Sequence, residues 1–317
     1  MFQLVREYIL FRRMVSLKKV MFIGTGFFFL YFIILFPPEA KSDPQPSFVL
    51  GEYASFQANG DIRRFVGEVL YFDISFLWFK NAATAKIGFY EKDGTYYSSL
   101  EAKTKGFIGF FTGFRQHIYR TNFDIIEGGK RVRANKFMRK VIEGGNVEKS
   151  EHFFDYNLRE HRWLNYENEE ITESSKEEIP IGINFDDVLT AFYNFRNGVY
   201  GPIRKGNRYT VQTIPEKGND KISIYIREIE QENQIRIEQG RKPGDELLID
   251  LLVPKNIFKT QSGRLRFWSS KHLIPIESTI KDYILLGDLH AVLNRRETRQ
   301  QAVPVKPPSI SFAPVQH

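Results

Sequence analysis

A regular alternation of apolar and other side chains runs through the middle of the chain. In residues 68–78, every second position from Leu70 onward is a large apolar residue. Successive side chains of a β-strand point to opposite faces, so a period of two indicates a strand with one face in a core. Residues 221–229 repeat the pattern with isoleucine at alternate positions.

Strands of this kind follow one another at the spacing of hairpins. They are predicted over residues 68–78, 83–90, 95–104, 116–125, 135–142, 147–154, 159–166, 208–214, 221–229, 247–253, 264–270, 275–281 and 287–293. Asp93-Gly94 and Gly144-Gly145 are suited to the tight turns between antiparallel strands. Aromatic residues make up 15% of the chain, which favours strands over helical bundles. We therefore predict a mainly β fold: a curved, partly closed antiparallel sheet, a clam-like half-barrel, with one or two short helices packed on it.

One segment has helical periodicity. The apolar side chains of residues 184–197 recur at helical spacing, and Gly198 follows the last of them. Asn184 is a suitable N-cap, and Asp186 and Asp187 fall in the first turn, where carboxylates complement the helix dipole. We expect a helix over residues 184–197 that lies on the sheet. The two aspartates are expected to serve its N-terminus rather than to form a catalytic pair.

A phenylalanine-rich segment, residues 106–114, has the sequence GFIGFFTGF. Its four phenylalanines stand at helical spacing among three glycines. Two interpretations are open. The segment forms a short helix that packs its phenylalanines inward, or it forms an aromatic rim that inserts into a membrane or covers a lipid tail.

The N-terminus combines a basic leader with an uncharged apolar run. Residues 1–19 carry five basic side chains and one acidic one, and residues 20–36 carry no charge. At about 1.5 Å per residue the apolar run spans about 25 Å of helix, near the lower limit for crossing a bilayer core of ~30 Å. The positive-inside rule places the leader in the cytoplasm and the rest of the chain across the membrane.

A cleaved signal peptide and an uncleaved signal anchor are both compatible with this segment. The leader and the apolar run are long for a signal peptide, and Pro38-Glu39-Ala40 has proline where a small residue is required for cleavage. The signal anchor is therefore favoured. It predicts a single-pass inner-membrane protein with its N-terminus inside and its folded domain in the periplasm.

The predicted organisation follows from these segments. It comprises a basic cytoplasmic leader (1–19), a transmembrane helix (20–36), a linker and lead-in (37–64), an antiparallel β-domain (65–293) and a disordered proline-rich tail (294–317). The basic start of the tail suits contact with anionic headgroups or with an envelope protein partner. A solvated terminus without a specific role is the alternative.

The net charge of +7 belongs to the two ends of the chain. Residues 1–20 sum to +4 and residues 294–317 to +3, which leaves residues 21–293 close to neutral. A basic footprint spread over the fold is therefore lacking, and we expect no nucleic-acid partner.

Five stretches occur in order across the predicted β-domain: GEVLYFDISFLWFKNAATAKIGFYEKDGTYYSSLEAKTKG, VIEGGNVEKSEHFFDYN, DDVLTAFYNFRNG, RLRFWSSKHLIPIESTI and GDLHAVL. Together they resemble domain-of-unknown-function family 3108, a group of bacterial envelope proteins. The resemblance implies a secreted or membrane-tethered antiparallel β-domain with no established catalytic residues. Such domains are distantly similar to the half-barrels that carry lipoproteins across the periplasm. The long basic leader and the proline-rich tail depart from a typical soluble member.

Residues for catalysis are few. Cysteine is absent, which excludes disulfides, thiolate zinc sites and cysteine nucleophiles. The phosphate-binding, serine-nucleophile and zinc-helix motifs are also missing. Glu151-His152 and Glu160-His161 could converge on a metal if their strands were neighbours, but we expect them on solvated strand faces. We predict a protein that is not an enzyme and has neither metal nor cofactor.

A basic run provides candidates for binding anionic headgroups: Arg133, Lys136, Arg139 and Lys140. The alternative is a solvated edge strand whose charges oppose aggregation.

The leading functional hypothesis is an apolar cavity inside the sheet that binds a lipid or a similar hydrophobic ligand in envelope biogenesis or transport. Each buried methylene group would contribute about 0.8 kcal/mol. The candidate lining residues are Phe72, Ile74, Phe76, Trp78, Phe107, Phe110, Phe111 and Phe192. The same residues would fill a solid core. The alternative is therefore a structural module with a filled core that positions an envelope partner.

Overall fold

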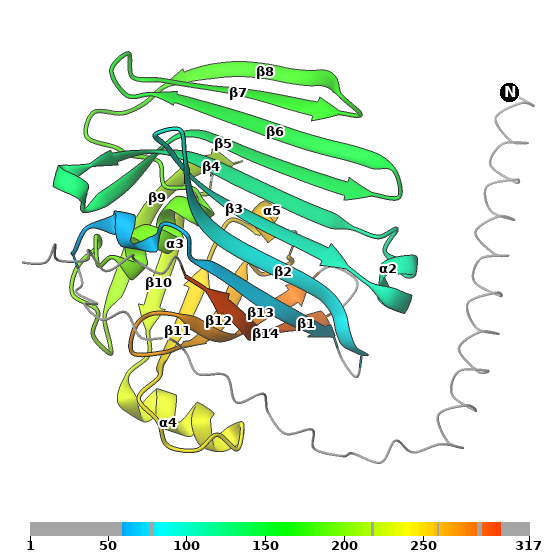
Figure 1. Ribbon diagram of the computed structural model, residues 1–317, viewed down its shortest axis with the longest axis vertical. Helices are drawn as coiled ribbons and strands as arrows, with labels where there is room; N and C mark the ends of the chain where they lie inside the picture. Colours follow the sequence, from blue (N-terminus) through cyan, green and yellow to red (C-terminus); the bar gives the residue numbers. More distant parts are fainter. Residues whose placement is uncertain (1–58, 77–78, 217–218, 259, 284–286, 299–317) are drawn as a thin grey trace, which may run out of the picture. The chain divides into compact units, whose positions relative to one another are not determined.

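A single antiparallel sheet dominates the computed structural model, which describes residues 59–76, 79–216, 219–258, 260–283 and 287–298 (Figure 1). Its strands within these ranges are β1 (Val69–Phe76), β2 (Phe79–Lys92), β3 (Thr95–Thr104), β4 (Gln116–Ile126), β5 (Arg131–Glu143), β6 (Asn146–Asp155), β7 (Glu160–Glu167), β8 (Glu170–Glu178), β9 (Arg208–Glu216), β10 (Asn219–Ile226), β11 (Leu247–Leu252), β12 (Arg264–Ser269), β13 (Pro275–Tyr283) and β14 (Gly287–Glu297). The predicted transmembrane segment, most of the linker and most of the tail lie outside these ranges. No helix within them is long and apolar enough to cross a membrane.

Two meanders make up the sheet. Strands β1 to β8 pair in chain order, strands β9 to β14 do the same, and β1 pairs with β14 at the junction. Figure 1 shows β1 (blue) and β14 (red) side by side. Strands β8 and β9 are the two edges, so hydrogen bonds do not close the sheet. The mainly β, antiparallel fold is confirmed, whereas closure of the sheet is not observed.

The hairpin turns follow the sequence closely. Strand β2 ends at Lys92 and β3 begins at Thr95, and the two residues between them, Asp93 and Gly94, have φ angles of 51° and 76°. Positive φ at both central residues matches the twist of the flanking strands, and the Asp-Gly pair allows it. The predicted turn at this position is therefore confirmed.

Strand β8 was not predicted. It is almost wholly exposed, and its sequence EITESSKEE lacks an apolar face. This strand forms one edge of the sheet, where charged side chains discourage pairing with another chain. By contrast, β5 lies between β4 and β6, so the prediction of an edge strand for the basic run is wrong.

The helices within the described ranges are short: η1 (Ile62–Phe65), α2 (Gly106–Phe111), η2 (Glu127–Gly129), α3 (Val188–Arg196), α4 (Ile229–Glu238) and α5 (Lys255–Phe258). They exceed the one or two that were predicted. Helix α4 occupies residues that were partly assigned to a strand, because β10 ends at Ile226.

Helix α3 starts later than predicted, and its N-cap is Asp187 rather than Asn184. The Asp187 carboxylate accepts hydrogen bonds from the backbone of Leu189 (2.9 Å) and from the Thr121 hydroxyl of β4 (2.7 Å). Asp187 is 2% exposed, so these donors replace water around its charge. The same contacts fix the start of α3 to the sheet.

Helix α3 lies between the two meanders. Its Leu189 packs with side chains of β4, β5 and β6, and its Phe195 packs with side chains of β9, β10 and β11. Ile214 of β9 belongs to the same cluster as Tyr119 of β4. The sheet therefore bends round α3 until its two halves share a core, as Figure 1 shows.

Candidate ligand cavity

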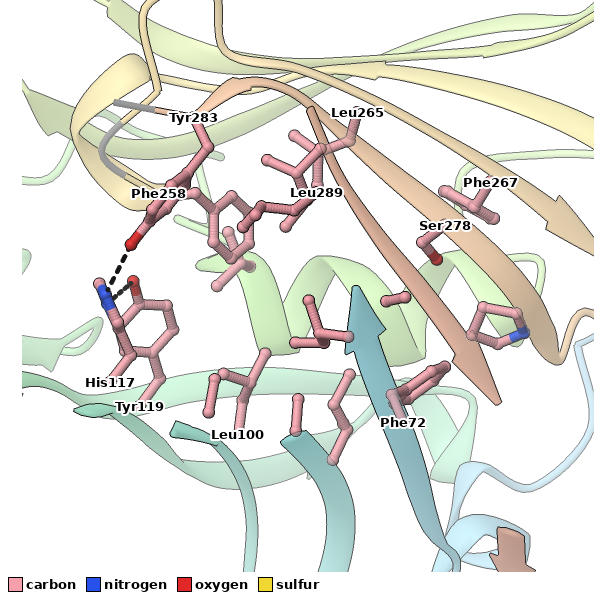
Figure 2. A pocket seen from close by; sticks show the side chains of 18 of the residues that line it. Phe72, Leu100, His117, Tyr119, Phe258, Leu265, Phe267, Ser278, Tyr283 and Leu289 are labelled. Atoms are coloured by element: carbon pink, nitrogen blue, oxygen red, sulfur yellow. Dashed lines mark hydrogen bonds between the residues drawn. The ribbon is translucent and has the colours of Figure 1, made fainter. Parts of the chain in front are cut away.

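A cavity of about 270 Å³ lies inside the curve of the sheet. Strands β1 to β4 and β10 to β14 contribute side chains to its wall, and residues Val188 to Phe195 of α3 contribute another part. Figure 2 shows α3 passing behind the cavity, with strands of both meanders on either side. The wall is predominantly apolar, as expected for a site that takes an apolar ligand.

Alanines at positions that face inward leave the cavity open, because their side chains are small. Ala85 is paired with Ala102 across β2 and β3, and all four of Ala83, Ala85, Ala102 and Ala291 line the cavity. Ile74 of β1 lies between Ala83 on one side and Ala291 on the other. Side chains in adjacent strands pack directly against each other across a ladder. A row of methyl groups in register therefore forms a depression that larger residues would fill.

The predicted lining residues are placed as follows. Phe72, Ile74 and Phe76 of β1 and Phe192 of α3 line the cavity. Phe107 and Phe110 do not: they are 51% and 71% exposed on α2. Trp78 and the side chain of Phe111 lie outside the part of the chain that the structure describes.

Helix α2 buries its isoleucine and exposes two of its phenylalanines, which is the reverse of the inward-packing interpretation. Ile108 is buried against Phe76 and lines the cavity, whereas Phe107 and Phe110 face outward and Phe114 is 53% exposed. The inward-packing interpretation is therefore wrong for these phenylalanines. The helix presents an exposed aromatic surface beside the cavity.

Polar side chains at the α2 side of the cavity form a connected row. The Arg115 Nη1 donates to the Tyr283 hydroxyl (3.3 Å), which lies 3.4 Å from His117 Nε2. His117 Nδ1 lies 3.4 Å from the Tyr119 hydroxyl, which in turn donates to the Ile257 carbonyl. Figure 2 shows Tyr283 and His117 meeting on the side opposite to Phe72 and Phe267.

The charge on Arg115 is held by its neighbours. Burial opposes the charged form, but the hydrogen bonds with Glu143 and Tyr283 outweigh it and raise the pKa of Arg115. The guanidinium is thus charged at every physiological pH, with its side chain only 15% exposed.

The two histidines of the acid–histidine pairs do converge, although without their neighbouring acids. His152 Nδ1 lies 3.0 Å from His161 Nε2, and His161 Nδ1 lies 2.9 Å from the Glu177 carboxylate. Alternation places Glu151 on the other face, where it binds Lys136. The prediction of solvated histidines is wrong, since His152 and His161 are 7% and 1% exposed. Burial, together with the charges of His161 and Arg139, lowers the pKa of His152 to about 3. In the described ranges, no three side chains of the ligating types are grouped to hold a metal ion.

The other of the two neighbouring aspartates, Asp186, belongs to a separate buried cluster. Asp186 accepts from Arg131 (2.9 Å) and from the Tyr200 hydroxyl (2.6 Å). Burial raises the pKa of Asp186, against the opposing effect of the Arg131 charge and these hydrogen bonds. The cluster ties β5 to α3 and to the segment that follows it.

The side chains of the basic run lie on both faces of β5, because successive residues of a strand point to opposite sides. Arg133 lies 3.4 Å from the Asp124 carboxylate, and Lys136 lies 2.9 Å from that of Glu151. Arg139 occupies the opposite face from Lys136 and Lys140, on the same face as buried Phe137. The four candidates for headgroup binding therefore do not form one surface.

Comparisons with known proteins leave the family open. No family model matches the chain, and neither does any curated protein. Among solved structures, it is similar to a β-barrel-like protein of domain of unknown function 1849 from Brucella abortus, at 10% identity, 75% coverage of this chain, 100% coverage of that chain and a TM-score of 0.42. A protein of domain-of-unknown-function family 1089 from Pseudomonas aeruginosa is also similar, at 10% identity, with 67% of this chain and 95% of that chain covered and a TM-score of 0.27. The resemblance to family 3108 stays a prediction.

Proposed function

We propose that this protein binds a lipid or another hydrophobic ligand without chemically changing it. The observation that carries the proposal is the cavity of about 270 Å³, walled by apolar side chains of both meanders and of α3. Binding would transfer methylene groups from water to this wall, at about 0.8 kcal/mol for each group. Shape and apolarity therefore supply the affinity.

The size of the cavity limits the ligand. Typical sites for small molecules have volumes of roughly 300–1,000 Å³, and this cavity, at about 270 Å³, lies just below that range. It suits one acyl chain better than the complete body of a two-chain lipid.

A filled structural module is the alternative, and the alanine rows argue against it. Protein interiors are packed as densely as organic crystals, and a space inside them costs stability. A protein with a purely structural role would gain stability from larger residues at Ala85 and Ala102. Their presence in register at the wall of the cavity is explained by a ligand that needs the space.

The proposed setting is the cell envelope. We infer an inner-membrane anchor at residues 20–36 that holds the folded domain in the periplasm, because of the uncharged apolar run behind a basic leader. Phe107 and Phe110 of α2 support contact with a membrane, because exposed aromatic side chains partition into the interface. The tail was predicted to begin at residue 294, but β14 extends to Glu297, so the proposed contact for an envelope protein partner is residues 298–317.

A titration with a neutral amphiphile tests ligand binding. The full chain, held in a detergent with a bulky steroid tail, is mixed with dodecanol, and bound molecules are counted by native mass spectrometry. We expect one bound molecule for each chain. In the Ala102→Phe variant the ring occupies the cavity, and affinity should fall at least tenfold.

Glu101→Phe is the matched control, because the neighbouring residue of β3 adds the same ring on the other face. It should bind like the wild type. Absence of binding to the wild type, or equal binding by Ala102→Phe, would refute the proposal.

A further inference from the structure

The polar residues of the cavity wall are gathered at one end. At this end lie Lys103 and Thr104 of β3, Arg115 immediately before β4, His117 at the start of β4 and Tyr283 at the end of β13. Ser278 is the polar lining residue on the other side, as Figure 2 shows. An apolar space with polar groups at one end matches the division of an amphiphile into tail and headgroup.

The charge that faces the cavity at this end is positive. The lining residues include Arg115 but no carboxylate, and Lys103, also at the wall, shares the outward face of β3 with Glu101. Glu143 binds the guanidinium of Arg115, but this carboxylate is 45% exposed and is not part of the wall. The guanidinium, whose side chain is 15% exposed, is therefore the charged group at the wall, and its carboxylate partner lies outside the wall.

Arg115 also retains donor capacity. Its Nη1 and Nη2 atoms bind Tyr283 and Glu143, while its Nε is buried and has no hydrogen-bond partner among the described residues. The two terminal nitrogens carry two N–H groups each, so each has a further donor for an acceptor on a ligand.

We propose that the Arg115 end of the cavity binds the anionic headgroup of a single-chain amphiphile, such as a fatty acid carboxylate or an alkyl phosphate. The tail then lies along the alanine rows towards Phe72 and Phe267. The headgroup accepts from Arg115, with the Tyr283 hydroxyl beside the guanidinium as a second donor. This inference rests on the proposed function and adds a headgroup class and an orientation to it.

A series of probes with one tail and different headgroups tests the inference. Dodecanoate, dodecyl phosphate, dodecanol and dodecyltrimethylammonium are each titrated into the full chain in the same steroid-based detergent, and occupancy is followed by native mass spectrometry. Dodecanoate or dodecyl phosphate should bind at least tenfold more tightly than dodecanol, and the cation more weakly than dodecanol. The tighter of the two anions identifies the headgroup chemistry.

Two variants locate the effect. Arg115→Gln should reduce the affinity for the preferred anion about tenfold and leave the affinity for dodecanol unchanged. Arg120→Gln removes a cation from the exposed side of β4, the strand that begins directly after Arg115, and should change neither affinity. Tyr283→Phe removes a hydroxyl from the same end of the cavity and provides a second test if Arg115→Gln fails to fold, with a loss of about threefold for the anion alone.

Three results would overturn the inference or its basis. Equal affinity of the wild type for dodecanoate, dodecyl phosphate and dodecanol would refute the headgroup site and leave the proposed function intact. An equal loss of both ligands in Arg115→Gln would show that Arg115 maintains the fold rather than recognising the headgroup. Failure of every probe to bind would refute the proposed function itself.

Discussion

Ala85 lies directly opposite Ala102 in the ladder between β2 and β3, and both line the cavity. Pairs of apolar residues at such positions usually pack against each other and against the opposite wall. Two methyl groups leave that space open. The presence of alanine at both positions therefore accounts for the open cavity on which the proposed function depends.

The first prediction compares two alanines on inner faces of the sheet. Ala102→Leu should leave the free energy of unfolding unchanged within about 0.5 kcal/mol or raise it, because the added carbons enter the cavity. Ala134→Leu should lower it by about 1–3 kcal/mol, because Ala134 is 0% exposed in a close-packed cluster with Tyr119 and Phe137. Chemical denaturation of both variants measures the difference. Equal destabilisation would mean that the space at Ala102 is not available to a side chain.

The strands were predictable because alternation is a local property. Strand β1 and the turn at Asp93-Gly94 follow from residues that are neighbours in sequence. The cavity was not predictable in the same way. Ile74 meets Ala83 and Ala291 through the pairing of β1 with β2 and β14, and the last contact joins residues more than two hundred positions apart. Alternation shows that a residue faces inward but not what it faces.

The second prediction concerns the start of α3. Asp187→Ala should destabilise the protein by about 2 kcal/mol or more, because it leaves the Leu189 amide and the Thr121 hydroxyl without their acceptor. Asn184→Ala, at the N-cap predicted from sequence, should cost less than about 0.5 kcal/mol. Chemical denaturation of the two variants tests the assignment. A larger cost for Asn184→Ala would return the cap to the earlier position.

The shift of this N-cap has a physical reason. Asn184 and Asp187 are both good capping residues, so local preference does not separate them. Thr121 decides in favour of Asp187, because its hydroxyl donates from β4 across the interface. Long-range contacts of this kind also explain why the histidines were misplaced. Their burial depends on the stacking of His161 on Phe154 and on its contact with Phe185.

The third prediction concerns pH. Burial lowers the pKa of His152 to about 3 in the folded protein, whereas an unfolded histidine has a pKa of about 6.5. Between these values the unfolded state binds the proton more readily, so stability is present above pH 6.5 and is lost as the pH falls. His152 alone should cost about 1 kcal/mol between pH 7 and pH 5.5.

The His152→Phe variant tests this dependence. Denaturation at pH 7 and at pH 5.5 should show a smaller loss of stability than in the wild type, because the titrating group is absent. His290→Phe, at an exposed position of β14, should retain the wild-type loss. An identical loss in His152→Phe and the wild type would show that His152 does not contribute.

The fourth prediction concerns the anchor. The full chain should stay in the membrane fraction after an alkaline carbonate wash, and its intact mass should include residues 1–36. A protease added to spheroplasts should digest the folded domain, which the positive-inside rule places outside the cytoplasm. An intact mass that begins near Lys41 would indicate a cleaved signal peptide. Protection of the domain from the protease would reverse the predicted orientation.

Identification of a co-purified ligand tests the central claim most directly. The full chain is extracted gently from its own membranes, and its bound small molecules are identified by native mass spectrometry, with Ala85→Leu/Ala102→Leu prepared in parallel. The account predicts a single-chain amphiphile bound to the wild type and absent from the double variant. Wild-type protein that carries no amphiphile under gentle extraction, or a double variant that carries the same one, would contradict it.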